Sequence, residues 1–183
     1  MSSNFNIKNW PIVYFKSNEN GVNDESFEEY KKDYLSLLLL CKQKNEKMVL
    51  ICNIDVKESI PMKYIMKQVQ FNKEVYKFNK EYIKCVCIMC KDKNFKNILT
   101  LYFGMVRPAA PYKLCRSFLK VNKYLVERHN ITFNTQIFDE NNNNIVEEED
   151  DNQNDEYESI IDNTKEEELY DKNKDIEQVI NNL

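Results

Sequence analysis

The chain has 183 residues, of which 42% are apolar, and only two are glycine. Two glycines cannot supply the glycine-rich phosphate loops of Rossmann-type and P-loop nucleotide enzymes, so those classes are excluded. Residues 1–138 carry 23 basic and 13 acidic side chains, a net +10, whereas residues 139–183 carry 3 and 17, a net −14. This division predicts one basic domain followed by an acidic appendage.

The first third of the chain predicts a strand, a helix and a second strand. Residues 1–9 are polar, and we expect them to be an N-terminal extension. Residues 10–16 (WPIVYFK) are aromatic and β-branched, which is typical of a strand that has a proline near its start. A helix follows, with Ser26 and Glu29 as its capping box. Residues 47–55 (KMVLICNID) are an apolar run bounded by charge, which indicates a strand buried on both faces.

The middle of the chain repeats this alternation. Ser59 is the expected N-cap of a helix that runs to about residue 80. Residues 82–90 (YIKCVCIMC) predict another buried strand, and Asp92 is expected to cap a helix that ends at Gly104. The connector at residues 107–111 (RPAAP) cannot be helical, because proline lacks a backbone N–H group.

The last predicted elements complete four strand–helix units. Residues 112–116 predict a short strand, and Ser117 the N-cap of a final helix. Alternation of this kind predicts an α/β domain at residues 10–130, with a four- or five-stranded, mainly parallel sheet and helices packed on it. Residues 139–183 combine low hydrophobicity with high charge, which predicts a disordered acidic tail. A sparse apolar stripe favours a marginal helix at residues 164–183.

Residues 10–128 resemble a known family. The stretches WPIVYF, KMVLICNIDVKESIPMKYIMKQ and RPAAP with YKLCRSFLKVNKYL are similar to the STAS domain in its anti-sigma-factor-antagonist-like branch. The resemblance implies a regulator that binds a protein partner and is switched by phosphorylation of a serine at a helix N-terminus. Ser59 is the nearest counterpart of that serine, and Asn53 stands where an aspartate is common. A related branch resembles lipid-binding CRAL-TRIO domains, which implies an apolar ligand as the alternative.

The cysteines and the single histidine suggest structure rather than chemistry. On a strand, Cys85 and Cys87 face one side and Cys90 the other, so the three thiols cannot converge on a metal without a bulge. We therefore predict buried thiols and no metal site. His129 is the only histidine and falls at a predicted helix end, with no nucleophile at a suitable spacing. No catalytic residue is predicted.

Candidate binding residues fall into three groups. Ser59 is either a phosphate or anion site or a plain helix cap. A cleft is expected beyond the carboxyl ends of the strands, with the rigid connector beside it. The cleft residues are Asn53, Asp55, Lys91, Asp92, Arg107, Arg116 and Ser117. Lysines at helical spacing form either a docking face or a plain solvated surface. The partner of such a docking face would be an acidic protein, an anionic lipid surface or the chain's own tail. They are Lys63, Lys67, Lys73, Lys77 and Lys80.

These residues include no nucleophile–base pair, so we predict a non-enzymatic regulatory or protein-interaction module without a cofactor. The alternative is a carrier of a lipid or other apolar small molecule, which would need a cavity of about 300–1,000 Å³. Nucleic acid is not an expected partner, because the chain has only three arginines and a negative net charge. With no apolar run of about 20 residues and no secretory signal, we expect a cytoplasmic protein without a transmembrane segment.

Overall fold

Five strands form a single sheet in the order β1-β2-β3-β4-β5. The computed structural model describes residues 5–17, 21–54, 60–90 and 93–133, and the description concerns these residues only. The first pair is antiparallel and the other neighbours are parallel, which confirms an α/β fold with a five-stranded, mainly parallel sheet. The strands are β1 (Phe5–Asn9), β2 (Ile12–Lys16), β3 (Met48–Asn53), β4 (Ile83–Met89) and β5 (Tyr112–Cys115).

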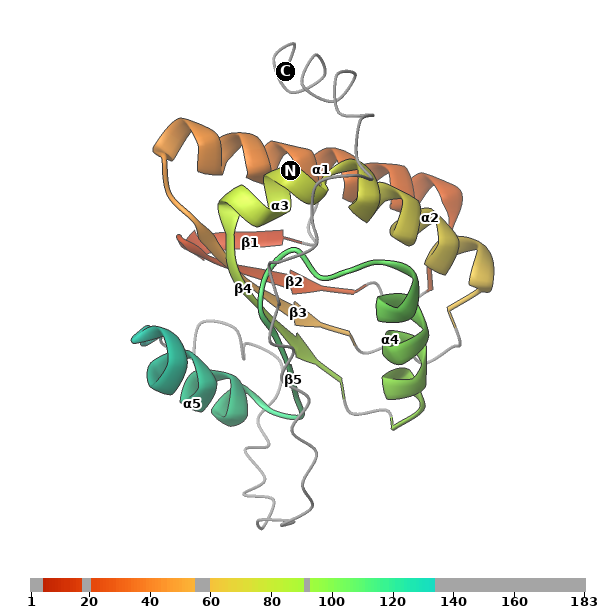
Figure 1. Cartoon of the computed structure of the whole chain (residues 1–183). Coiled ribbons are helices and arrows are strands. Elements are labelled where there is room, and N and C mark those ends of the chain that lie inside the picture. The colour runs from red at the N-terminus through yellow and green to blue at the C-terminus, as the bar shows by residue number, and fades with distance from the viewer. Residues whose placement is uncertain (1–4, 18–20, 55–59, 91–92, 134–183) are drawn as a thin grey trace.

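The helices are distributed unequally over the two faces of the sheet. They are α1 (Asp24–Lys44), α2 (Met62–Glu74), α3 (Tyr76–Tyr82), α4 (Lys93–Met105) and α5 (Phe118–His129). The first four lie on one face, and α5 lies on the other (Figure 1). This follows from the strand order, because successive right-handed crossovers that advance in one direction place every connecting helix on the same side.

Alternation along the strands builds a core on both faces. In β3, Met48 and Leu50 face α1, whereas Val49 and Ile51 face α5. The predicted burial of this strand on both faces is therefore confirmed. Leu37 of α1 is fully buried against the first face. Burial of a leucine side chain contributes about 1.5–3 kcal/mol, so such residues fix how the helices sit on the sheet.

The N-cap of helix α1 lies three residues before the expected cap. Asn23 has an extended backbone, its Oδ1 accepts from the Ser26 N–H at 2.8 Å, and Ser26 Oγ accepts from the Asn23 N–H at 3.0 Å. The predicted box of Ser26 and Glu29 is therefore wrong, because Ser26 is the third residue of the helix and not its cap. Asp24 and Glu25 add negative charge to the first turn, where the helix dipole favours it.

Other boundaries also differ from the predictions. Pro61 occupies the N-cap position of α2 without a side-chain cap bond, so Ser59, which lies outside the described residues, is not the cap of this helix. The predicted helix to residue 80 is divided at Val75 into α2 and α3. Gly104 lies inside α4 and does not end it. The residues expected to be an extension include strand β1.

The structure tests one of two further predictions for the end of the domain. The Ser117 cap is confirmed, because its side chain accepts from the Lys120 N–H at 3.4 Å. The predicted division between domain and tail at residue 139, with the helix at residues 164–183, lies outside the described residues and stays a prediction.

Candidate functional site

A cavity of about 340 Å³ lies on the face of the sheet that α1–α4 cover. Strand β3 lines it with Leu50 and Cys52, and β4 lines it with Val86 and Ile88. Residues two apart on a strand face the same side, so these four side chains border the same space. Helices α1, α2, α3 and α4 and the connector at residues 107–110 contribute further walls, and α4 packs against α2. We call this space the inner cavity.

Aromatic rings line the inner cavity. From α1, the ring of Tyr30 lies 5.6 Å from that of Phe15 and 6.1 Å from that of Phe27, measured between centroids. At the α4 side, the rings of Phe103 and Tyr112 are stacked with centroids 4.2 Å apart. Large rings of this kind favour apolar and aromatic molecules, because they offer wide apolar contact at a fixed geometry.

A chain of hydrogen bonds joins four helices along the wall of the inner cavity. Tyr34 Oη donates to Asn79 Oδ1 at 2.9 Å, and Asn79 Nδ2 donates to Asn72 Oδ1 at 3.4 Å. Asn72 Nδ2 in turn donates to the Tyr102 hydroxyl. We call Tyr34, Asn79, Asn72 and Tyr102 the polar strip. It links α1, α3, α2 and α4. Its hydrogen bonds give partners to buried polar groups, which would destabilise the fold if they were left without any.

The hydroxyls of this wall act as neutral donors. Gln68 Nε2 donates to Tyr30 Oη at 3.1 Å, and the Tyr102 hydroxyl accepts from Asn72 Nδ2, so both oxygens act as acceptors. Each hydroxyl has its own proton in addition. Burial raises the pKa of Tyr102 to about 12 and that of Tyr30 further, so both protons stay in place at neutral pH. Burial also raises the pKa of the Cys52 thiol to about 12, which makes it a poor nucleophile.

Arg107 is the only charged residue among the described residues that line the inner cavity. It is half-buried, and no hydrogen bond or ion pair joins its side chain to another described residue. The preceding residue, Val106, is buried, and its N–H donates to the Tyr102 carbonyl at 3.0 Å. The irregular path of residues 107–111 confirms that the connector is not helical, and it carries Arg107 to the inner cavity.

The predicted strand-end cleft stays a prediction, because Asp55, Lys91 and Asp92 lie outside the described residues, and of the other four only Arg107 lines the inner cavity. Asn53 Nδ2 donates to Tyr14 Oη at 2.9 Å, and this bond ties β3 to β2. Ser117 caps α5, and Arg116 precedes it. Ser59 also lies outside the described residues. The order of the described strands never reverses, so this sheet has no switch point of the kind that creates a crevice there.

The predicted docking face is partly neutralised. The carboxylate of Asp24 accepts hydrogen bonds from Lys63 Nζ and Lys67 Nζ, each at 2.8 Å. These bonds join α1 to α2, lower the pKa of Asp24 below its usual range and raise that of Lys63. Lys73 lies in α2, whereas Lys77 and Lys80 lie in α3 beyond the division at Val75. The five lysines therefore do not form one continuous free stripe.

The cysteines pack inside the domain. Cys85, Cys87 and Cys115 are buried on the face that α5 covers. Hydrogen bonding with the thiols of Cys115 and Cys85, together with burial, raises the pKa of Cys87. In the described part of the chain, no three His, Cys, Asp or Glu side chains are grouped so that they could hold a metal ion. His129 ends α5, and its ring lies 5.3 Å from that of Tyr124.

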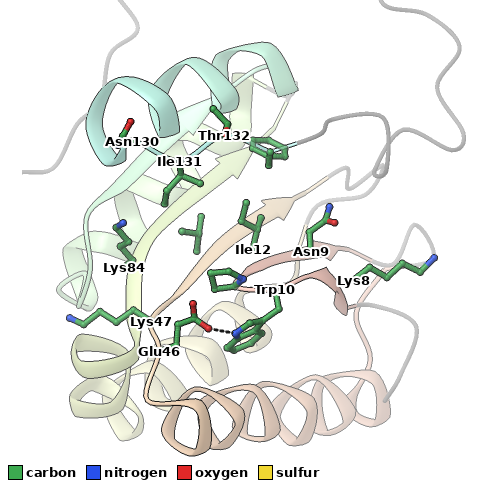
Figure 2. Close-up of a pocket in the computed structure, with 13 residues that line it drawn as sticks. Lys8, Asn9, Trp10, Ile12, Glu46, Lys47, Lys84, Asn130, Ile131 and Thr132 are labelled. Atoms are coloured by element: carbon green, nitrogen blue, oxygen red, sulfur yellow. Dashed lines mark hydrogen bonds between the residues drawn. The ribbon is translucent and has the colours of Figure 1, made fainter.

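A second pocket, of about 870 Å³, lies at the amino ends of β2, β3 and β4. We call it the edge pocket. Figure 2 shows Trp10 donating to the Glu46 carboxylate at its border, with Lys8 and Lys47 extending away from its centre. These charged groups thus do not converge on a common point. We therefore place the candidate functional site in the inner cavity.

Most residues of the inner cavity were not identified from the sequence as a site. Phe27, Tyr30 and Tyr34 have helical spacing, which also describes an ordinary packed core. The signal in the sequence that could have indicated the inner cavity is a set of polar residues on an inward helix face. Gln68, Asn72 and Asn79 occur at intervals of four and seven residues within the inward face of α2 and α3, where apolar residues are expected.

No protein-family model, curated protein or solved structure matches this chain. None of the helices in the described ranges combines the length and the apolar character that crossing a membrane requires.

Proposed function

We propose that this protein binds a small apolar molecule in the inner cavity. The observation that carries the proposal is a space of about 340 Å³ inside the domain, bordered by aliphatic strand residues and aromatic helix residues. Sites for small molecules have volumes of about 300–1,000 Å³ and are lined mainly by apolar side chains with a few polar groups. Here the polar strip and Gln68 are those polar groups.

Binding without chemical conversion fits the residues that line the inner cavity. The described lining residues include no Asp, Glu or His that could act as a general base. The one lining thiol, Cys52, holds its proton at neutral pH because burial raises its pKa. A carrier, or a sensor of an apolar ligand, needs neither group.

The resemblance to the STAS family and the role of a protein-interaction module stay predictions, as do the protein partner, the anionic membrane surface and the site at Ser59. Among these alternatives the inner cavity favours the carrier, because an interaction module does not need an internal space. The interaction role would still be compatible with a bound ligand that changes how the helices present themselves to a partner.

The test is a titration with 1-aminoanthracene, a small neutral aromatic molecule that fluoresces more strongly in apolar surroundings. We expect saturable binding of one molecule per chain. Val86→Phe places a larger side chain in the inner cavity and should weaken binding at least tenfold. Val126→Phe is the matched control, because Val126 is 39% exposed on α5, which covers the opposite face.

The comparison of Val86→Phe with Val126→Phe shows where 1-aminoanthracene binds as well as how tightly. Equal binding by the wild-type chain and Val86→Phe would show that the molecule does not enter the inner cavity. Absence of saturable binding to the wild-type chain would refute the proposed function.

A further inference from the structure

We propose that the ligand of the inner cavity is an amphipathic acid whose carboxylate is bound by the guanidinium of Arg107. This inference rests on the proposed function and adds the chemical class of the ligand. Among the described residues, none balances the charge of Arg107 at the inner cavity.

Arg107 borders apolar walls without a described partner. The described residues that line the inner cavity include no carboxylate, and no ion pair or hydrogen bond joins the side chain of Arg107 to another described residue. A half-buried charge that gives up part of its hydration is stabilised when an ion of opposite sign joins it. The planar guanidinium matches the two oxygens of a carboxylate in a paired arrangement, which a lysine cannot reproduce.

The connector holds Arg107 in place. Val106 and Ala110, on either side of it, are 4% and 6% exposed, so the loop is anchored in the core at both ends. Pro108 and Pro111 fix their own backbone φ angles. An arginine presented from such a segment has less freedom to lose on binding, and this favours affinity.

The hydroxyl groups of the wall favour the same class of ligand. The hydroxyls of Tyr30 and Tyr102 both accept a hydrogen bond from the protein and each carry a proton of their own, so they can donate to oxygen atoms of a ligand. The aliphatic and aromatic walls accommodate the apolar part. A neutral ligand could fill the apolar walls and accept from the hydroxyls, but it would leave the charge of Arg107 without a partner among the described residues.

The experiment compares two molecules with the same ten-carbon chain, decanoate and decan-1-ol, as competitors that displace 1-aminoanthracene from the full-length protein. We expect wild-type protein to bind decanoate at least tenfold more tightly than decan-1-ol. Arg107→Gln should remove this preference and leave the affinity for decan-1-ol within about twofold. Arg107→Lys should restore only part of it, because the ammonium keeps the charge but not the paired geometry.

The matched control is Arg128→Gln, which makes the same change of charge at an exposed residue of α5. It should keep the full preference for decanoate. Retained binding of decan-1-ol by Arg107→Gln would show that this variant is folded and that its cavity is intact.

The outcomes separate this inference from the proposed function. Equal displacement by decanoate and decan-1-ol, or a preference that survives Arg107→Gln, would overturn the role of Arg107 while the inner cavity remains a binding site. Failure of wild-type protein to bind 1-aminoanthracene, decan-1-ol and decanoate would overturn both.

Discussion

Cys52 shows how the inner cavity acts on a single residue. Its side chain is half-buried, and the part that protein atoms do not cover borders the inner cavity. Burial among apolar groups raises its pKa from the ordinary 9.0 to about 12, because a thiolate would lose its hydration there. The neighbouring hydroxyl of Tyr102 responds in the same direction. Burial at the inner cavity therefore keeps the Cys52 thiol and the Tyr102 hydroxyl neutral at physiological pH.

This pKa shift predicts how stability depends on pH. An unfolded chain loses the Cys52 proton near pH 9, whereas the folded chain keeps it until about pH 12. The stabilising contribution is therefore complete below pH 9 and is lost as pH rises from 9 to 12. Cys52→Ala removes this contribution, so at about pH 10.5 its free energy of unfolding should have fallen about 1–2 kcal/mol less than that of wild-type protein.

Urea unfolding at pH 8 and pH 10.5 checks this prediction. The difference between the two proteins at pH 8 gives the cost of the smaller side chain and serves as the control. If both proteins lose the same free energy between the two pH values, Cys52 is not shielded from water in the folded chain.

At the scale of elements, the position of α1 matters most for the site. Its first two turns carry Phe27 and Tyr30, and these turns begin at the reciprocal hydrogen bonds between Asn23 and Ser26. The polar strip then connects α1 through Tyr34 to the other helices. A change at the start of α1 should therefore affect both stability and the cavity wall.

Asn23→Ala tests that connection. Loss of the side-chain cap should lower the free energy of unfolding by about 1 kcal/mol. Ser117→Ala at α5 should cost less, because the Ser117 bond to the Lys120 N–H is long, at 3.4 Å. Thermal unfolding of both variants, with binding of 1-aminoanthracene measured alongside, checks the order. A larger loss for Ser117→Ala would contradict it.

The elements differ in how well the sequence predicts them. Strand β3 and the Ser117 cap are predictable, because a continuous apolar run and a serine before a helical pattern have local causes. Strand β1 is not predicted, because three of its five residues are polar and its own composition does not favour a strand. It forms by pairing with β2, and composition alone does not reveal such pairing. The α1 cap was misassigned because Asn23 and Ser26 are both good cap residues only three positions apart.

At the scale of the molecule, the strand order decides where a site can form. Because β2, β3, β4 and β5 advance in one direction, α1–α4 gather on one face of the sheet (Figure 1). Residues of these four helices line the inner cavity. A doubly wound sheet would instead favour the carboxyl ends of its strands, which was the basis of the predicted cleft. Alternation of strands and helices predicts the fold class but not this order.

The inner cavity cannot be predicted from the sequence. Apolar periodicity identifies residues that face inward, but it does not say whether their side chains meet or leave a space between them. Arg107 was identified as a residue that a rigid connector could present to a ligand, and its position at the inner cavity was not. The polar residues Gln68, Asn72 and Asn79 on an inward face were the available clue.

The most direct test of the central claim is to locate a bound apolar molecule by solution NMR. Protein labelled with ¹³C at isoleucine methyl groups would be titrated with decan-1-ol. Ile54, Ile88 and Ile98 line the inner cavity, whereas Ile12 and Ile131 line the edge pocket (Figure 2). The account predicts saturable shifts of the first three methyl signals, with those of Ile12 and Ile131 almost unchanged. Shifts confined to Ile12 and Ile131, or no saturable shift at any of the five, would contradict it.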